Sequence, residues 1–265
     1  IMPDGRTLQV ASVHHYRDQW AKAFDIKYES ESGGQKYVHQ TTYGMSERLL
    51  GATVATHGDD KGLIMPPSIA PIQVVVIPIL SKEGSEEIVS AAEEIVKTLK
   101  SERIRVKLDN RDIRPGQKYY DWEIKGVPLR IELGPRDLKS NSYMCARRTG
   151  EKCSYSLGDL VNSVKKELDS VNEHMKEAAN THFNKHIKQM PSIEIVGSNI
   201  SIETNLEDGF VYEMPFEGND AQAELIENET GFSFLGESTT PYSKERKCLV
   251  TGKYTINRIF LAKTY

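Results

Sequence analysis

An arginine in the first turn of an expected helix is the sequence feature best suited to chemistry. The stretch 37–43 (YVHQTTY) has the aromatic and β-branched content of a strand, and apolar residues recur at helical spacing from Ser46 onward. Gly44 lets the chain turn, and Ser46 can cap the helix. The free N–H groups of a helix start attract anions, and Arg48 adds a planar cation suited to phosphate oxygens. The segment therefore predicts a polyphosphate site, although a surface arginine on an ordinary core helix would give the same pattern.

Composition limits the class of protein. The 265 residues are enough for two or three compact units with a sizeable core. The longest apolar run, 74–80, is far shorter than the roughly 20 residues that cross a bilayer, and we expect no secretory leader. Cys145, Cys153 and Cys248 form no CxxC pair, which argues against a disulfide framework and for a reducing compartment. We therefore expect a cytoplasmic protein with no membrane partner.

Charge is distributed unevenly along the chain. The net charge of −4 comes from 34 Lys and Arg against 38 Asp and Glu and does not favour nucleic acid by itself. Six basic residues nevertheless lie between Arg103 and Lys118, and ten acidic residues without a Lys or Arg lie between Glu203 and Glu237. A polyanion senses charges within about 8 Å, so a local basic surface can bind RNA. Alternatively, both runs are solvated faces.

The expected elements fall into three blocks. In the first, we expect a mixed sheet domain that ends in a proline-rich linker, with strand 7–13, helix 18–24, strand 37–43 and the helix after Gly44. The second alternates strands and helices, as in a largely parallel sheet covered by helices, at 74–80, 85–100, 104–108, 118–125 and 129–133. In the third, a long helix over 158–190 precedes strand-like runs separated by polar turns, at 198–203, 210–214 and 257–263.

Several of these stretches together resemble the prolyl-tRNA synthetases of the archaeal and eukaryotic type, a family of class II aminoacyl-tRNA synthetases. The glycine-led helix is similar to motif 3 of that class, and the other resembling stretches are 7–26, 109–138 and the terminal AKTY. The resemblance implies an α/β and α+β multidomain fold. Its expected parts are the end of an antiparallel-sheet catalytic domain (1–70), an α/β anticodon-binding domain (71–157), and the long helix with a small α/β C-terminal domain (158–265).

The resemblance also implies a reaction. The family uses ATP and Mg²⁺ to activate proline and transfers it to tRNA(Pro), and because the proline carboxylate is the nucleophile, the protein mainly positions groups and offsets charge. Gln9 and Ser12 match positions at the ATP and its magnesium, and Ser46 with Arg48 matches the ATP-binding end of motif 3. His14 matches a position in the proline pocket. Arg48 and His14 are thus the candidate catalytic residues.

Two of these assignments depend on strand geometry. Tyr43 is expected in the aromatic wall against which the proline ring packs. Strict alternation puts Ser12 and His14 on one face of a strand and Gln9 on the other, so either a bulge shifts the register or one assignment is wrong. A buried, hydrogen-bonded histidine is the alternative role for His14.

Anticodon recognition is expected in the second block. Proline anticodons share two adjacent guanines, whose O6 and N7 acceptors suit arginine or lysine, and unpaired bases can be stacked on aromatic or guanidinium planes. We predict base contacts from Lys125, Arg130 and Glu132, and phosphate contacts from Arg114 and Arg136. Each could instead be an ordinary surface charge.

No metal site is expected. Many relatives carry a zinc-binding cysteine quartet in the terminal domain, and the four matching positions here are Glu217, Gln222, Cys248 and Thr251. A structural zinc site normally needs four sulfur or nitrogen ligands, so one cysteine cannot reproduce it. His182 and His186 are four residues apart on the long helix, but the sequence offers them no further ligands.

Two other interpretations of the function stay open. The family's enzyme has a substantial region before the position of Ile1, with motifs 1 and 2, and is expected to be a homodimer at full length. Without that region the chain is expected to be inactive, which would leave a noncatalytic tRNA-binding module. Another class II enzyme, such as the threonyl- or glycyl-tRNA synthetase, would share motif 3.

The resemblance also implies that the terminal Tyr265 packs toward the catalytic domain, whereas a frayed terminus is the alternative.

Overall fold

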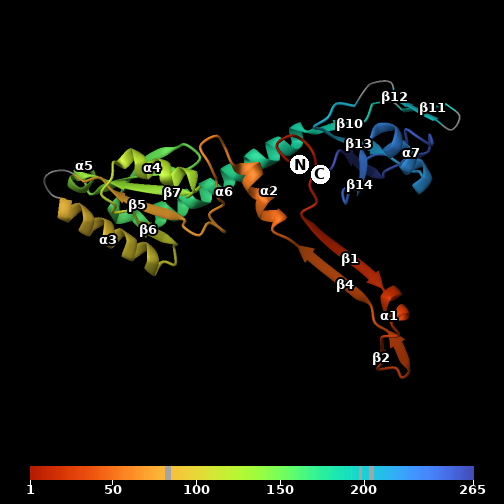
Figure 1. Ribbon diagram of the computed structural model, residues 1–265, viewed down its shortest axis with the longest axis horizontal. Coiled ribbons are helices and arrows are strands. Elements are labelled where there is room, and N and C mark those ends of the chain that lie inside the picture. The colour runs from red at the N-terminus through yellow and green to blue at the C-terminus, as the bar shows by residue number, and fades with distance from the viewer. Residues whose placement is uncertain (81–84, 192, 197–198, 203–205) are drawn as a thin grey trace. The chain divides into compact units, whose positions relative to one another are not determined.

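The computed structural model describes residues 1–80, 85–191, 193–196, 199–202 and 206–265. Contacts divide the chain into two compact units, which comprise residues 56–184 and residues 1–55 with 185–265 (Figure 1). Both contain helices and sheets, so the predicted mixture of α/β and α+β parts is confirmed. Among the described helices, none combines the length and the apolar character needed to span a bilayer.

The unit of residues 56–184 is built on a sheet with the strand order β6-β5-β7-β8-β9. Its strands are β5 (Val74–Pro78), β6 (Val106–Leu108), β7 (Leu129–Leu133), β8 (Ser142–Arg147) and β9 (Lys152–Ser156). Strand β5 runs parallel to both β6 and β7, as the sequence predicted, whereas β8 and β9 extend the sheet as an antiparallel hairpin. The hairpin was not predicted.

Helices cover both faces of this sheet (Figure 1). They are α3 (Ser85–Ser101), α4 (Pro115–Ile124), α5 (Pro135–Lys139) and α6 (Leu160–Lys185). On one face α3 and α6 pack over Val74 and Val76, and on the other Trp122 of α4 packs over Val75 and Ile77, because alternate strand residues point to opposite faces. The apolar cluster under α4 includes no described residue of β8 or β9, and the β9 side chains on that face are exposed.

The other unit begins with strands and short helices. They are β1 (Ala11–Arg17), α1 (Gln19–Ala23), β2 (Lys27–Glu29), β3 (Gln35–Tyr37), β4 (Gln40–Met45) and the start of α2 (Arg48–His57). Strands β1 and β4 form an antiparallel ladder, and β2 pairs with β3. The ladder brings the residues before β1 next to the turn between β4 and α2.

Residues 185–265 form a second sheet with the strand order β10-β13-β17-β14. Its strands are β10 (Ile187–Gln189), β13 (Val211–Pro215), β14 (Ser233–Glu237) and β17 (Arg258–Ala262). The remaining elements are β11 (Ile193–Val196), β12 (Asn199–Ile202), helix α7 (Asp220–Thr230), β15 (Arg246–Lys247) and β16 (Tyr254–Thr255). Met214, Ile226 and Leu261 are fully buried between α7 and the sheet.

Several predicted elements were wrong in extent. The long helix ends at Lys185 rather than near Met190, because residues 187–189 pair with β13 instead. The first strand lies at 11–17 instead of 7–13, where it pairs with β4. Helix α7 was predicted as strands and turns, although Asn219 and Gln222 form a capping box at its start. Both ends of the strand predicted at 198–203 lie outside the described residues.

Candidate nucleotide and RNA sites

Residues predicted to bind ATP meet at the turn between β4 and α2. The Gln9 Nε2 donates to Ser12 Oγ at 2.9 Å, and the Arg48 Nη1 donates to the Gln9 carbonyl oxygen at 3.1 Å. The Arg48 backbone N–H donates to Ser46 Oγ at 3.3 Å, which caps the first turn of α2. A guanidinium carries five N–H donors, so the bond to Gln9 leaves others for an anion. Arg48 is exposed, and the arrangement can therefore bind phosphate at the helix start.

The expected conflict between Gln9 and Ser12 has a simple resolution. Gln9 lies before β1, which begins at Ala11, so strand alternation does not apply to it. Its side-chain amide returns to Ser12 instead. The irregularity in the β1–β4 register falls between His15 and Arg17, beyond both residues. Neither a bulge between Gln9 and Ser12 nor a wrong assignment is needed.

The two residues predicted for the proline pocket lie on opposite faces of the β1–β4 ladder. His14 pairs with Thr42, and Tyr43 pairs with Val13, and directly opposed residues share a face. Tyr43 is 74% exposed. His14 is also exposed, and its ring stacks on Tyr16 with centroids 5.4 Å apart, so it is not the buried histidine of the alternative interpretation. Within this ladder His14 and Tyr43 do not line one wall.

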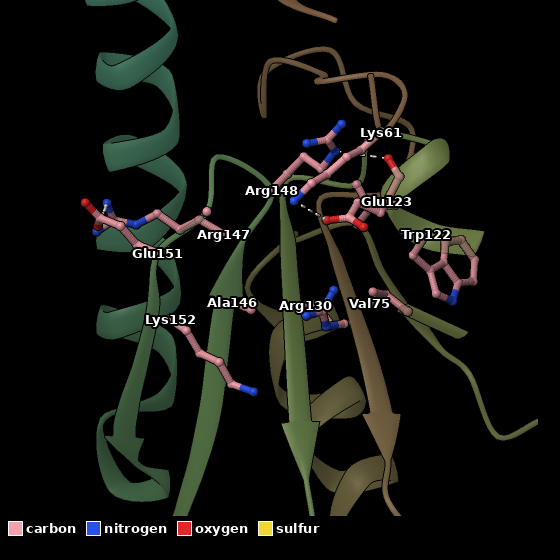
Figure 2. Close-up of a pocket in the computed structure, with 12 residues that line it drawn as sticks. Lys61, Val75, Trp122, Glu123, Arg130, Ala146, Arg147, Arg148, Glu151 and Lys152 are labelled. Atoms are coloured by element: carbon pink, nitrogen blue, oxygen red, sulfur yellow. Dashed lines mark hydrogen bonds and ion pairs between the residues drawn. The ribbon is translucent and has the colours of Figure 1, made fainter. Parts of the chain in front are cut away.

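A basic pocket of about 160 Å³ lies on the sheet of the other unit, beside α4 (Figure 2). Its floor is a row of directly paired residues across neighbouring strands, namely Val75, Arg130, Ala146 and Lys152. The rest of the lining comes from the end of α4, the β8–β9 hairpin and a turn before β5, and consists of Lys61, Trp122, Glu123, Val127, Arg147, Arg148, Gly150 and Glu151. Cations outnumber carboxylates in this lining, so the pocket favours an anionic ligand.

A buried carboxylate fixes the two cations on the pocket floor. Glu132 Oε1 accepts from Arg130 Nε at 3.0 Å, and its Oε2 accepts from Lys152 Nζ at 2.6 Å. The Arg130 guanidinium also lies 4.1 Å from the ring centroid of Tyr119, and burial together with Glu132 raises the pKa of Tyr119 to about 12. The Glu132 side chain is only 4% exposed and does not line the pocket, although we predicted it as a base contact. Its contacts are those of a support for Arg130 and Lys152.

The wall formed by α4 is held from behind. Trp122 Nε1 donates to Asp109 Oδ2 at 2.7 Å, and Arg111 Nη2 donates to the same oxygen at 2.7 Å. Burial alone would raise the pKa of Asp109, but the hydrogen bonds from Arg111 and Trp122 outweigh it and lower the pKa to about 2. The Lys125 Nζ lies 4.7 Å from the Trp122 ring centroid, just outside this pocket. Lys125 lines a separate, more apolar cavity of about 200 Å³, which Trp122 also lines.

The remaining predicted RNA contacts lie away from the pocket. Arg114 precedes α4 and Arg136 lies on α5, and both are exposed without lining the pocket. The basic run 103–118 does not form one free surface. Arg105 donates to backbone oxygens of the proline-rich linker, including that of Pro67 at 2.7 Å, and the buried Lys118 donates to the Asp109 carbonyl oxygen.

Sequence reasoning missed much of the pocket lining. Lys61, Arg148 and Lys152 were not singled out, and Glu123 was noted only as part of the resembling segment. The alternation of the segment 142–156 and the turn at Gly150 could have predicted the β8–β9 hairpin. That hairpin would have placed Lys152 beside β7. Nothing local points to Lys61, because its position depends on tertiary contacts.

The positions that match a zinc quartet hold hydrogen bonds instead. Cys248 Sγ accepts from the backbone N–H groups of Glu217 and Thr251 at 3.3 and 3.4 Å. Burial would raise the pKa of Cys248, but hydrogen bonds from the Thr251 side chain and from nearby backbone N–H groups outweigh it and lower the pKa. The Glu217 carboxylate accepts from Thr255 Oγ1 at 2.9 Å, and Gln222 takes part in the cap of α7. In the described part of the chain no group of three His, Cys, Asp or Glu side chains is placed to hold a metal.

The other predicted positions in this unit have partners within the chain. The Tyr265 hydroxyl donates to Asp4 Oδ2 at 2.7 Å, and the Thr7 backbone N–H donates to the Lys263 carbonyl oxygen. The two chain ends are thus tied together. The ring of His186 lies 5.8 Å from that of Phe210.

Known proteins resemble both the whole chain and its sheet domain. Residues 73–167 match the family described as anticodon binding domain. The chain is 43% identical over its whole length to the proline–tRNA ligase of Methanosarcina mazei, covering 54% of that protein, and 44% identical to that of Thermococcus kodakarensis, covering 55%. The prolyl-tRNA synthetase of Giardia lamblia in complex with prolyl-adenylate superposes with a TM-score of 0.89 at 29% identity, covering 100% of this chain and 57% of that one.

The chain spans about half the length of the curated relatives it matches. The resemblance predicted from the sequence is therefore confirmed: over its whole length, the chain is homologous to part of the prolyl-tRNA synthetases, and it contains an anticodon binding domain.

Proposed function

We propose that this chain is part of a proline–tRNA ligase, which activates proline with ATP and transfers it to tRNA(Pro). The observation that carries the proposal is the basic pocket on the sheet that matches an anticodon binding domain. The relatives named proline–tRNA ligase support the assignment, as does the complex of the Giardia lamblia enzyme with prolyl-adenylate. We assign three functional segments, which are the end of the catalytic domain (1–70), the anticodon reader (71–157) and the helix with the C-terminal domain (158–265).

In the catalytic segment, the turn after β4 would form one wall of the nucleotide site. Arg48 is suited to offset charge on the phosphates, since the attacking proline carboxylate is itself an anion. Ser46 and the helix start supply N–H donors beside it. Gln9 and Ser12 carry neutral oxygens, which are ligands that Mg²⁺ accepts when phosphates provide the negative charge. These residues therefore fit magnesium only together with bound ATP.

His14 and Tyr43 are proposed for the proline subsite on separate faces of the ladder. Because the two side chains lie on opposite faces of the β1–β4 ladder, both can contact proline only if the proline ring lies at an edge of this ladder. Of the two, His14 shares a face with Ser12 and is the better candidate to lie next to the nucleotide. Tyr43 is the weaker assignment.

In the anticodon segment, the pocket is suited to guanine. Arg130 presents a planar fork that can donate to O6 and N7 of one base, and its guanidinium already lies over the ring of Tyr119. Lys152 adds a second cation, and the Glu123 carboxylate can accept from the N–H groups of a guanine Watson–Crick edge. Glu132 acts by holding the two cations. Arg114 and Arg136 are proposed as phosphate contacts away from the pocket, and Lys125, which we predicted as a base contact, is proposed as a phosphate contact as well because it does not line the pocket.

The activity is tested by pyrophosphate exchange. We expect proline-dependent exchange in the full-length protein and none in the 265-residue chain alone, which spans about half of its relatives. Exchange with threonine or glycine in place of proline would reject the amino-acid assignment. Absence of exchange with any amino acid at full length, together with tRNA binding, would favour a noncatalytic tRNA-binding module. We further propose that the full-length protein is a cytoplasmic homodimer, which sedimentation and cell fractionation would test.

A further inference from the structure

A turn outside the matched domain forms part of the pocket. The match to the anticodon binding domain begins at residue 73, yet Lys61 lines the pocket from a turn that precedes β5 (Figure 2). Asp59 and Gly62 close this turn through paired backbone hydrogen bonds of 3.0 Å. The Lys61 Nζ lies 3.7 Å from Glu123 Oε1, across the pocket mouth from the end of α4.

The turn is fixed against α4 by backbone contact. The Leu63 N–H donates to the Ile124 carbonyl oxygen at 3.0 Å, and the Met65 N–H donates to that of Gly126 at 3.2 Å. Gly62 has a φ of 131°, and a Cβ there would lie 2.5 Å from the Cα of Ile124. Such close approach is possible only without a side chain. The turn therefore packs directly on the helix end.

Arg148 holds the same turn from the sheet side. Its Nη1 donates to Asp59 Oδ2 at 2.9 Å, and its Nη2 donates to Asp59 Oδ1 and to the Gly62 carbonyl oxygen. Its Nε donates to the Glu123 carbonyl oxygen at 3.0 Å. The Arg148 side chain is only 2% exposed, so its bonds to the turn and to α4 are made inside the protein. One guanidinium thus joins the β8 end, α4 and the turn.

We propose that the turn of residues 59–62 is a built part of the RNA pocket, in which Lys61 contacts RNA phosphate and Arg148 is a positioning residue that holds the turn. This inference rests on the proposed anticodon function of the pocket. The Lys61 side chain is 66% exposed and can turn toward a ligand, whereas Arg148 is enclosed and acts only through Asp59, Gly62 and Glu123. The hydrogen bonds from Arg148 also lower the pKa of Asp59 to about 2, so the pair stays charged at neutral pH.

For the RNA affinity of the Asp59→Asn variant, the proposal and simple electrostatics predict opposite changes. Removing a negative charge beside an RNA site should tighten RNA binding if the charge acts only at a distance. If Asp59 instead fixes the turn, its replacement weakens RNA binding because Lys61 is no longer held at the pocket. Asp60→Asn is the matched control, because Asp60 is the exposed neighbour with the same charge. We expect it to leave binding unchanged or slightly tighter.

The experiment measures the affinity of the 265-residue chain for an RNA stem–loop with two adjacent guanines in its loop, at several salt concentrations. Lys61→Ala should weaken RNA binding severalfold. It should also reduce the magnitude of the slope of log K against log salt by about 0.7, which is the value for one phosphate contact to a single strand. Lys97→Ala on α3, on the other face of the sheet, is the control lysine and should change neither. Asp59→Asn should mimic Lys61→Ala.

The double variant decides whether the two residues act together. If the turn works through Lys61, Asp59→Asn combined with Lys61→Ala weakens binding no more than Asp59→Asn alone. Additive losses, or wild-type affinity in either single variant, would overturn the inference. A purely structural role of Asp59 would lower thermal stability without this coupling, so the melting curve of each variant is recorded beside its affinity.

A measurement on the unmodified chain guards against variants that fail to fold. Acylation of lysines, read by mass spectrometry, should be slower at Lys61 when the stem–loop is bound and unchanged at Lys97. Equal labelling of Lys61 with and without RNA would overturn the inference. Arg130→Ala separates this result from the proposed function. If it abolishes guanine preference while the turn variants bind normally, only the turn inference fails. If no preference for guanine exists in the first place, the anticodon function fails too.

Discussion

The two candidate sites differ in how much of each is enclosed by this chain. In the pocket, Arg130 and Lys152 share a carboxylate that is 4% exposed, and a buried tryptophan backs the wall. On β4, which leads into the turn of the nucleotide site, the side chains of Tyr43 and Met45 are 74% and 75% exposed. A pocket whose two cations share a buried carboxylate keeps its geometry without further contacts, whereas an open turn forms only one side of a site. We therefore expect the proposed RNA pocket to bind its ligand within this chain alone, and the proposed nucleotide site to need further contacts.

The largest expected effect separates the sites by function. In the full-length protein, Arg48→Ala should lower the rate of proline-dependent pyrophosphate exchange by about 10²–10³-fold, the usual cost of losing a group that stabilises developing charge. The melting temperature of the chain should hardly change, because Arg48 is exposed. Stem–loop affinity should be unaffected. A parallel loss of RNA binding would contradict the separation of the two sites.

The next effect concerns the support beneath the pocket. Glu132→Ala removes the carboxylate shared by Arg130 and Lys152 and should destabilise the unit by about 2–3 kcal/mol, less than for a fully buried pair because Lys152 is 45% exposed. Urea unfolding measures this cost. Glu151→Ala, on the exposed hairpin, is the control and should cost less than about 1 kcal/mol. Equal losses of unfolding free energy in the two variants would show that the burial of Glu132 does not contribute to the stability of the unit.

Base recognition should depend on the fork of Arg130. Arg130→Lys keeps the charge and loses the planar pair of donors, so we expect the preference for guanine to fall by about 1–3 kcal/mol while nonspecific binding persists. Competition between stem–loops with guanine or adenine at the two loop positions measures the preference. An unchanged preference would reduce Arg130 to a phosphate contact.

The smallest effect is on how the unfolding free energy of the unit that contains the pocket depends on pH. The pKa of Asp109 is lowered to about 2 in the folded state by Arg111 and Trp122, against burial, so its contribution to stability is present above about pH 4 and is lost as the pH falls toward 2. Its size is about 2 kcal/mol. Asp109→Asn should therefore narrow the difference between unfolding free energies at pH 6 and pH 2.5. The same difference in wild type and variant would exclude Asp109 as the titrating group.

Local signals predicted that a strand leads into a capped helix carrying Arg48. Strand β4, the cap at Ser46 and the arginine two residues later lie within ten residues of one another, so periodicity and capping rules suffice. The turn predicted at Gly44 was misplaced, because Gly44 lies within β4 and pairs with Ser12. The return of Gln9 to Ser12 was not predictable, because it depends on where β1 begins. Strand limits are set by pairing with β4, which a single stretch of sequence does not specify.

The pocket was predicted only in part, for a related reason. Arg130 was found because it lies in a resembling segment, but Lys152 reaches it through the register of β8 and β9. Lys61 reaches the same place through the bonds that Arg148 makes to Asp59, 89 residues away. Glu132 was identified as important but given the wrong position, because strand alternation does not reveal which carboxylates become buried partners.

The pocket of Arg130 and Lys152 is proposed to distinguish guanine in an unpaired loop. The most direct measurement compares the affinity of the 265-residue chain for two stem–loops that differ only in having two adjacent guanines or two adenines. We expect the loop with guanines to bind roughly tenfold or more tightly per base than the loop with adenines. Equal affinities for the two loops at the same salt concentration would contradict it.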